Sequence, residues 1–161
     1  VSIIPRGRAG GYTISLPKED KFYMSKTEMM DTITVLLGGR VAEKLVLNDI
    51  STGAQNDIQR ATSIARKMVT KYGMSDEMGP MTFGGEQDEV FIGRDFAQAR
   101  NYSEDVAMKI DNEVKKIIDS SYRRAETLLK ENLNKLHKVA EVLLEKEKLD
   151  GPEFDEIFTN A

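Results

Sequence analysis

Apolar residues recur at helical spacing through most of this chain, whereas alternation of apolar and polar residues is confined to its N-terminal segment. There, Tyr12 to Leu16 alternate strictly after a glycine-rich turn, which predicts a short β-hairpin or ribbon over residues 1–17. No other segment shows this period. The pattern therefore predicts a mainly α-helical fold with a small N-terminal β-ribbon, and a helical core over residues 25–75.

The first helix of that core is predicted from residue 26 to residue 37. Ser25 and Glu28 have the spacing of a capping box, in which each side chain accepts a hydrogen bond from the backbone of the other residue. Gly38 and Gly39 then interrupt the pattern, and a further helix follows over residues 40–45. We expect it to pack closely where the glycines lack side chains.

A second stretch, residues 54–72, places its apolar side chains on one helical face and ends at Gly73, a residue typical of helix ends. Asp57 falls in the first turn of this predicted helix. Six methionines of the chain are expected to fill the core rather than to line a binding groove. They are Met29, Met30, Met68, Met74, Met78 and Met81.

Residues 76–93 read as a loop rich in glycine and acidic residues, and its part over residues 84–93 either borders an active-site cleft or a subunit interface, or is a solvated loop. The C-terminal helices are predicted over residues 94–161. They comprise two helices in antiparallel contact, broken near residues 132–134, and a short final helix over residues 153–158. Residues 1–161 together are predicted to form a single domain.

Composition excludes several classes of function. The chain has 161 residues, a net charge of −4 and interspersed basic residues, so it lacks the basic surface expected of a nucleic-acid-binding protein. The absence of cysteine excludes disulfides and thiolate metal sites. No apolar run approaches the roughly 18 residues that a membrane-spanning helix requires. The chain is therefore expected to be soluble as given.

The run from Ser51 to Asp57, Ser-Thr-Gly-Ala-Gln-Asn-Asp, is the strongest candidate for chemistry. A carboxylate in the first turn of a helix is stabilised by the exposed N–H groups there, by about 0.3–1 kcal/mol. Most such aspartates are therefore structural. Taken on its own, Asp57 is therefore interpreted as a helix-terminus residue, and only the residues around it favour a role as a metal ligand.

That run and other segments, taken in order, resemble the peptidase domain of the FtsH family of ATP-dependent, membrane-anchored zinc metalloproteases. The resemblance covers nearly the whole chain. The matching segments are Val1 to Gly7, Gly11 to Thr13, Leu36 to Glu43, Ser51 to Thr62, Tyr72 to Ser75 and Tyr102 to Glu104.

The resemblance implies that Asp57 is the third zinc ligand of such a protease. The other two ligands of the family lie in a His-Glu-x-x-His helix whose glutamate is the general base, and that helix precedes the segment that begins here at Val1. His137 is the chain's single histidine and no glutamate follows it, so the general base is expected upstream. We expect His137 to lie at the surface or core edge, and this chain alone to hold no catalytic zinc and to be inactive.

The family further implies a larger protein that is a hexameric ring in a bacterial plasma membrane, with this domain in the cytoplasm. Its ATPase module, which binds ATP and magnesium, and its membrane helices both precede the peptidase domain. Unfolded polypeptides, from misassembled membrane proteins and short-lived cytoplasmic proteins, are the expected substrates. Within this chain, Gly38 and Gly39 belong to no phosphate-binding loop. The competing interpretation is a non-catalytic helical assembly module of a protease-like ring.

Four further assignments have two interpretations each. Glu43 is either an outer partner of the zinc region or, as we prefer, a solvated or salt-bridged helix residue. Thr52 and Asn56 either hold the ligand loop by hydrogen bonds or cap the helix there. The strand Gly11-Tyr12-Thr13-Ile14 either pairs with an extended substrate through its edge or is covered by helices.

Overall fold

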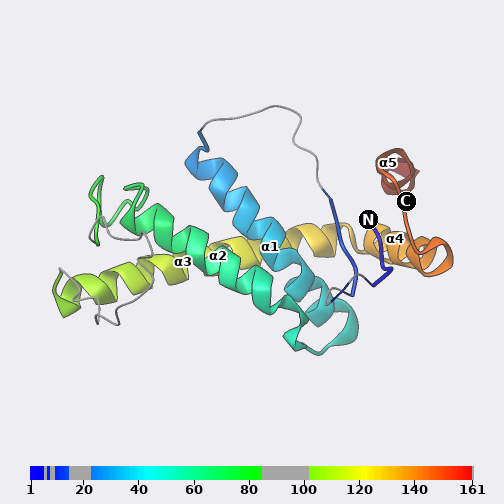
Figure 1. Ribbon diagram of the computed structural model, residues 1–161, viewed down its shortest axis with the longest axis horizontal. Helices are drawn as coiled ribbons and strands as arrows, with labels where there is room; N and C mark the ends of the chain where they lie inside the picture. Colours follow the sequence, from blue (N-terminus) through cyan, green and yellow to red (C-terminus); the bar gives the residue numbers. More distant parts are fainter. Residues whose placement is uncertain (6, 8–9, 15–22, 85–101, 161) are drawn as a thin grey trace. The chain divides into compact units, whose positions relative to one another are not determined.

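The computed structural model describes residues 1–5, 7, 10–14, 23–84 and 102–160, and the described part is mainly helical (Figure 1). It divides into two compact units, which are described separately: Met24–Glu126, and Val1–Tyr23 with Thr127–Ala161. The single domain predicted for the chain stays a prediction. The elements are α1 (Lys26–Leu47), the 3-10 helix η1 (Thr52–Ala54), α2 (Gln55–Thr70), α3 (Glu104–Glu131), α4 (Leu133–Lys146) and α5 (Gly151–Asn160).

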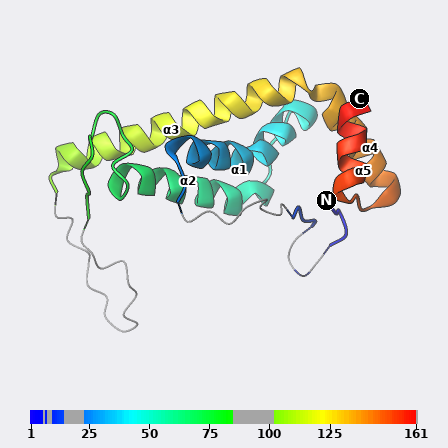
Figure 2. The same cartoon turned by 90° about the horizontal axis from the view of Figure 1, so that it is seen from above.

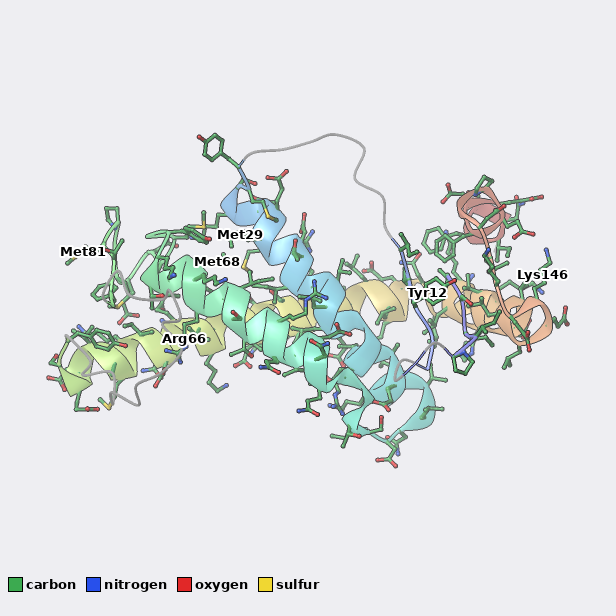
Figure 3. All side chains as sticks on the ribbon, in the orientation of Figure 1. Tyr12, Met29, Arg66, Met68, Met81 and Lys146 are labelled. Atoms are coloured by element: carbon green, nitrogen blue, oxygen red, sulfur yellow. The ribbon has the colours of Figure 1, made fainter. Side chains whose placement is uncertain are left out.

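In the unit Met24–Glu126, α1 and α2 pack against each other and lie beside α3 (Figure 2). Buried residues of α3 belong to the same core. The predicted apolar face of α2 is confirmed, since Ala61, Ala65, Met68 and Val69 are fully buried. Figure 3 shows Met29 and Met68 between these helices. Met30, Met74 and Met78 also pack against the core, but Met81 is 58% exposed, so its assignment as core filler is wrong.

The predicted break at Gly38 and Gly39 is also wrong, because α1 runs unbroken for 22 residues through both glycines. Leu37 and Val41, which flank the pair, are buried in the packing of α1, so burial on either side outweighs the weak helix propensity of glycine. A Cβ atom at either glycine would meet no atom of a described residue within 4 Å. Close packing among the described residues therefore does not require a glycine at these positions.

Local signals correctly predict the start of α1 and the glycine turn that follows α2. The Ser25 hydroxyl accepts a hydrogen bond from the Glu28 N–H at 3.2 Å, and the Glu28 carboxylate accepts one from the Ser25 N–H at 2.8 Å, which confirms the predicted capping box. Gly73 follows α2 with φ +58°, and a Cβ atom there would lie 2.8 Å from the Pro80 Cα. Both the backbone angle and the close approach favour glycine at this turn.

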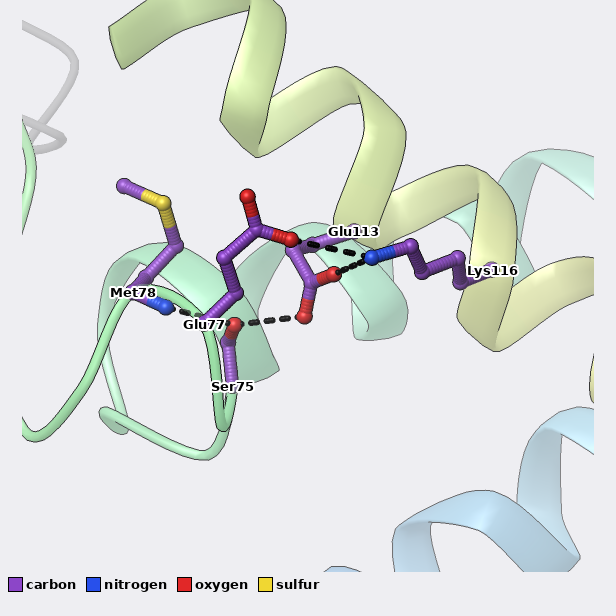
Figure 4. A network of polar contacts seen from close by, with 5 residues as sticks. All are labelled: Ser75, Glu77, Met78, Glu113 and Lys116. Carbon is purple, nitrogen blue, oxygen red and sulfur yellow. Dashed lines mark hydrogen bonds and ion pairs between the residues drawn. The ribbon is translucent and has the colours of Figure 1, made fainter.

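A polar network, in which Ser75 and Glu113 are buried, attaches the segment after α2 to α3 (Figure 4). The Ser75 hydroxyl donates to the Glu113 carboxylate at 2.6 Å and accepts from the Met78 N–H at 3.1 Å. Lys116 bridges Glu113 and Glu77 at 2.6 and 2.9 Å. The hydrogen bonds from Lys116 and then Ser75 lower the pKa of the Glu113 carboxyl and keep this buried group ionised. Of the predicted loop over residues 84–93, residues 85–93 lie outside the described residues.

The β-ribbon predicted over residues 1–17 is wrong for the described residues of the second unit. Among its described residues none forms a strand; instead Ser2 makes isolated antiparallel bridges to Tyr12 and to Lys148. Among the described residues of the predicted hairpin, one pair, Ser2 with Tyr12, exchanges backbone hydrogen bonds, at 2.8 and 2.9 Å. Contacts with the segment before α5 take the place of a longer hairpin, and residues 15–17 of the prediction lie outside the described residues.

The predicted break between the C-terminal helices is confirmed, since α3 ends at Glu131 and α4 begins at Leu133. The antiparallel contact of these two helices stays a prediction. The final helix, α5, is longer than predicted and begins with a second capping box that sequence analysis missed, in which Asp150 and Glu153 exchange hydrogen bonds at 2.9 and 3.1 Å. Within the described part of the chain, no helix combines the length and the apolar character needed to cross a bilayer.

Replacing Gly39 by alanine is expected to stabilise the protein. Gly39 is an exposed residue inside α1 whose Cβ position is open, so alanine adds helix propensity without a clash. The free energy of unfolding should rise by about 0.5–1 kcal/mol in urea titrations. The matched Gly73→Ala variant should lose stability. A fall in stability for Gly39→Ala would show that the side-chain-free surface at this position is required for folding.

Replacing Glu113 by glutamine is expected to flatten the acid side of the pH–stability profile. Because folding lowers the pKa of Glu113, this group stabilises the native state above the ordinary carboxyl range, and the contribution is lost as pH falls through the folded pKa. At neutral pH the substitution should cost about 1.5–3 kcal/mol. The exposed control Glu145→Gln should stay within about 0.5 kcal/mol of wild type at each pH. An unchanged acid limb in Glu113→Gln would contradict this account of the network.

Candidate metal centre

Asp57 lies in the first turn of α2, where the sequence pattern predicted it. The chain enters α2 through η1, and the Gln55 N–H donates to the Thr52 carbonyl across this junction. No side chain caps α2 at Ala54. The exposed N–H groups and dipole of the helix therefore favour a negative group at this end, and Asp57 supplies one.

The Asp57 carboxylate is positioned to take a cation. Its side chain is 48% exposed, and its recorded ion-pair partner is Arg60 on the next turn, at a long 4.0 Å. An ion pair of this length between exposed groups holds a carboxylate weakly. The oxygens of Asp57 are thus accessible, on a rigid helix and at a defined place, as a metal ligand requires.

The turn before Asp57 is held by Ser51, to which sequence analysis assigned no separate role. The Ser51 hydroxyl accepts a hydrogen bond from the Gly53 N–H at 3.2 Å and so caps η1. The Ser51 carbonyl accepts from Nη2 of Arg40 on α1 at 2.8 Å. The spacing of serine and glycine signals such a turn in the sequence, but the contact with Arg40 depends on the tertiary packing of α1.

Glu43 lies one turn beyond Arg40 on α1 and contacts the same serine. Hydrogen bonds from the Ser51 hydroxyl and then the Ser51 N–H lower the pKa of the Glu43 carboxyl, and the charge of Arg40 adds to this effect. The nearest recorded separation between the two charged groups is 3.7 Å, from Arg40 Nη1 to Glu43 Oε2. Glu43 is thus paired with Arg40, and its role as an outer partner of the zinc region stays a prediction.

The structure places Thr52 and Asn56 on exposed positions of η1 and the first turn of α2. The capping hydroxyl at this turn belongs to Ser51, one residue before Thr52. A role of Thr52 or Asn56 in holding the ligand loop stays a prediction.

Asp57 alone does not make a metal site. Among the described residues there is no group of three histidine, cysteine, aspartate or glutamate side chains that could hold a metal ion. His137, the chain's single histidine, is exposed on α4. A metal bound by Asp57 needs further ligands from residues outside the described part.

The other candidate segment, Gly11 to Ile14, belongs to the second unit. Tyr12 donates its N–H to the Ser2 carbonyl and accepts from the Ser2 N–H, so both backbone groups of Tyr12 face Ser2. A Cβ atom at Gly11 would lie 2.7 Å from the Ser2 oxygen, which explains a glycine at this close approach. In antiparallel pairing, the backbone groups of Thr13 point to the opposite edge. Thr13 and Ile14 are both exposed.

Comparison with known proteins finds relatives over nearly the whole chain. The profile of the protein family described as Peptidase family M41 matches residues 1–157. An ATP-dependent zinc metalloprotease FtsH 1 from Thermoanaerobacter sp. strain X514 is 70% identical over 98% of this chain and 26% of its own length. A protein from Caldicellulosiruptor bescii, named ATP-dependent zinc metalloprotease FtsH, is 71% identical over 96% of this chain and 25% of its own length.

A more distant relative with the same name, from Bacillus subtilis, is 49% identical over 100% of this chain and 25% of its own length. The chain therefore spans about a quarter of the length of the curated relatives that it matches.

Proposed function

Because the chain belongs to Peptidase family M41 and corresponds to a C-terminal part of the FtsH peptidase domain, we propose that Asp57 is a zinc ligand of an ATP-dependent endopeptidase. The observation that carries the proposal is the accessible Asp57 carboxylate, which lies in the first turn of α2 and is only weakly paired with Arg60.

The donor chemistry of Asp57 fits zinc. Zinc accepts a carboxylate oxygen beside two imidazoles and leaves a fourth position open in catalytic sites. The two imidazoles and the general-base glutamate would come from the His-Glu-x-x-His helix of the complete protein. When bound, zinc polarises the peptide carbonyl and lowers the pKa of a coordinated water. Asp57 adds a negative charge to the site and fixes the metal against α2.

The segment Gly11 to Ile14 is proposed to align the substrate. An extended polypeptide would pair with the edge opposite Ser2, where the N–H and carbonyl groups of Thr13 are directed. Main-chain pairing gives register with little sequence preference, which suits an enzyme that degrades many proteins. The exposed side chains of Thr13 and Ile14 leave this edge open to a partner.

The complete protein is proposed to be a hexameric ring in a bacterial plasma membrane, anchored by segments that precede this domain, with the domain in the cytoplasm. Its ATPase module would bind ATP and magnesium and deliver unfolded polypeptides to the zinc site. Misassembled membrane proteins and short-lived cytoplasmic proteins are the proposed substrates. The relatives' names, which specify ATP dependence and zinc, support this proposal.

Replacing Asp57 by alanine in the complete protein is expected to reduce bound zinc sharply from one ion per chain, as measured by elemental analysis after dialysis. Loss of one of three protein ligands should also abolish hydrolysis of a casein substrate. The control Asp111→Asn alters an exposed aspartate of α3 and should retain zinc. Zinc retained in Asp57→Ala would make Asp57 a helix-terminus residue. Absence of zinc in the unmodified protein would favour the non-catalytic assembly module.

Replacing Thr13 by proline in the complete protein is expected to lower kcat/KM for an unfolded polypeptide about tenfold or more, because proline removes the N–H directed to the proposed substrate. Thr13→Ala keeps the N–H and should behave like wild type. Zinc content measured in parallel should be unchanged in both. Equal kcat/KM values for the proline and alanine variants would contradict pairing at this edge.

A further inference from the structure

Arg40 and Glu43 form, with Ser51, a charged clamp between α1 and the segment that leads to Asp57. The Ser51 carbonyl accepts from Nη2 of Arg40 at 2.8 Å, and the Ser51 hydroxyl accepts from the Gly53 N–H at 3.2 Å. Glu43 lies beside the same guanidinium, 3.7 Å from Nη1 of Arg40. Neither charged side chain is freely solvated, since Arg40 is 16% and Glu43 21% exposed. Hydrogen bonds to charged groups in such partly buried positions are stronger than neutral ones.

The clamp acts on the geometry of Asp57 through short, rigid connections. Ser51 caps η1, η1 leads directly into α2, and Ala54 at their junction is buried. Asp57 follows in the first turn of α2, and its own long ion pair with Arg60 cannot fix it. The start of α2 is therefore held against α1 by Ser51, not by contacts of the carboxylate itself.

We propose that Arg40 and Glu43 are positioning residues for the zinc ligand, which hold Ser51 so that the Asp57 carboxylate has one orientation before metal binds. This inference rests on the proposed function of Asp57. The proposed role requires the guanidinium group of Arg40, because two nitrogens of this group contact different partners. Nη2 binds the Ser51 carbonyl while Nη1 faces Glu43. The single ammonium group of a lysine does not reproduce this planar fork.

One feature of Arg40 argues against a role in stability alone. Its Nη1 atom is buried and makes no hydrogen bond to any described residue; the 3.7 Å approach to Glu43 is an ion pair without hydrogen-bond geometry. Burial of an incompletely bonded guanidinium nitrogen costs free energy. If stability were the only requirement, an apolar side chain in place of Arg40 would increase the free energy of unfolding. A hydrogen bond to the Ser51 carbonyl, in contrast, requires a donor such as the Arg40 guanidinium.

The test is zinc affinity in the complete protein, measured by competition with a chromophoric chelator for the unmodified protein and for Asp57→Ala, Arg40→Lys and Glu43→Gln. Loss of a partner that orients a metal ligand typically lowers metal affinity 10- to 100-fold. We expect about a tenfold loss for Arg40→Lys. The control is Arg66→Lys, which alters a more exposed Arg–Asp pair between α2 and α3 and should change affinity less than about twofold.

Thermal unfolding of the zinc-free proteins separates positioning from stability. If Arg40 only stabilises the fold, Arg40→Lys will lower Tm while zinc affinity of the folded protein stays unchanged, and that result would overturn the inference. Glu43→Gln is isosteric and decides the question if Arg40→Lys does not fold; an unchanged affinity in that variant would likewise overturn it. If Asp57→Ala weakens zinc binding but neither clamp variant does, the proposed function stands and the clamp fails. If Asp57→Ala binds zinc normally, both fail.

Discussion

The packing of α1 against α2 is the constraint on which the unit Met24–Glu126 depends. Ala61 and Ala65 present small side chains on α2, so the helices approach closely, and Ile33 of α1 and Met68 of α2 are fully buried in the same core. This apolar contact brings the start of α2 beside the second half of α1. The polar contacts of Ser51 with α1 are possible only because the hydrophobic core has already placed the two helices.

At the candidate site, apolar packing fixes the position of α2, and charged contacts hold the turn that precedes it. The core fixes the axis of α2, but the turn at its start carries backbone groups that need hydrogen-bond partners. Arg40 and Glu43 supply those partners for Ser51 while the Asp57 carboxylate stays accessible. The same division recurs near the other end of α2, where Glu113 and Lys116 hold the segment that contains Ser75. Charged side chains of α1 before α2, and of α3 after it, thus secure the irregular segments on both sides of α2.

Features that depend on neighbouring residues in the sequence were predicted correctly. The capping box at Ser25, the helical face of α2, the place of Asp57 in its first turn and the stop at Gly73 all follow from spacing and residue type. The resemblance of successive segments identified the family, which the comparisons confirmed. The capping box at Asp150 was readable by the same rule and was missed.

Features set by tertiary contacts were not predictable in this way. Glycine propensity suggested a break in α1, but burial of residues on both sides keeps the helix continuous. Alternation suggested a ribbon, yet Ser2 bridges to Lys148, far along the chain, as well as to Tyr12. The contact of Arg40 with Ser51 joins two elements whose relative position the local pattern does not specify.

The most direct test of the zinc-ligand assignment is a crystal structure of the complete peptidase domain, including its His-Glu-x-x-His helix, with zinc bound. The account predicts an Asp57 carboxylate oxygen at about 2.0–2.2 Å from the metal, beside two imidazoles. It would be contradicted by a zinc ion whose protein ligands are complete without Asp57, with that carboxylate directed to solvent or to Arg60.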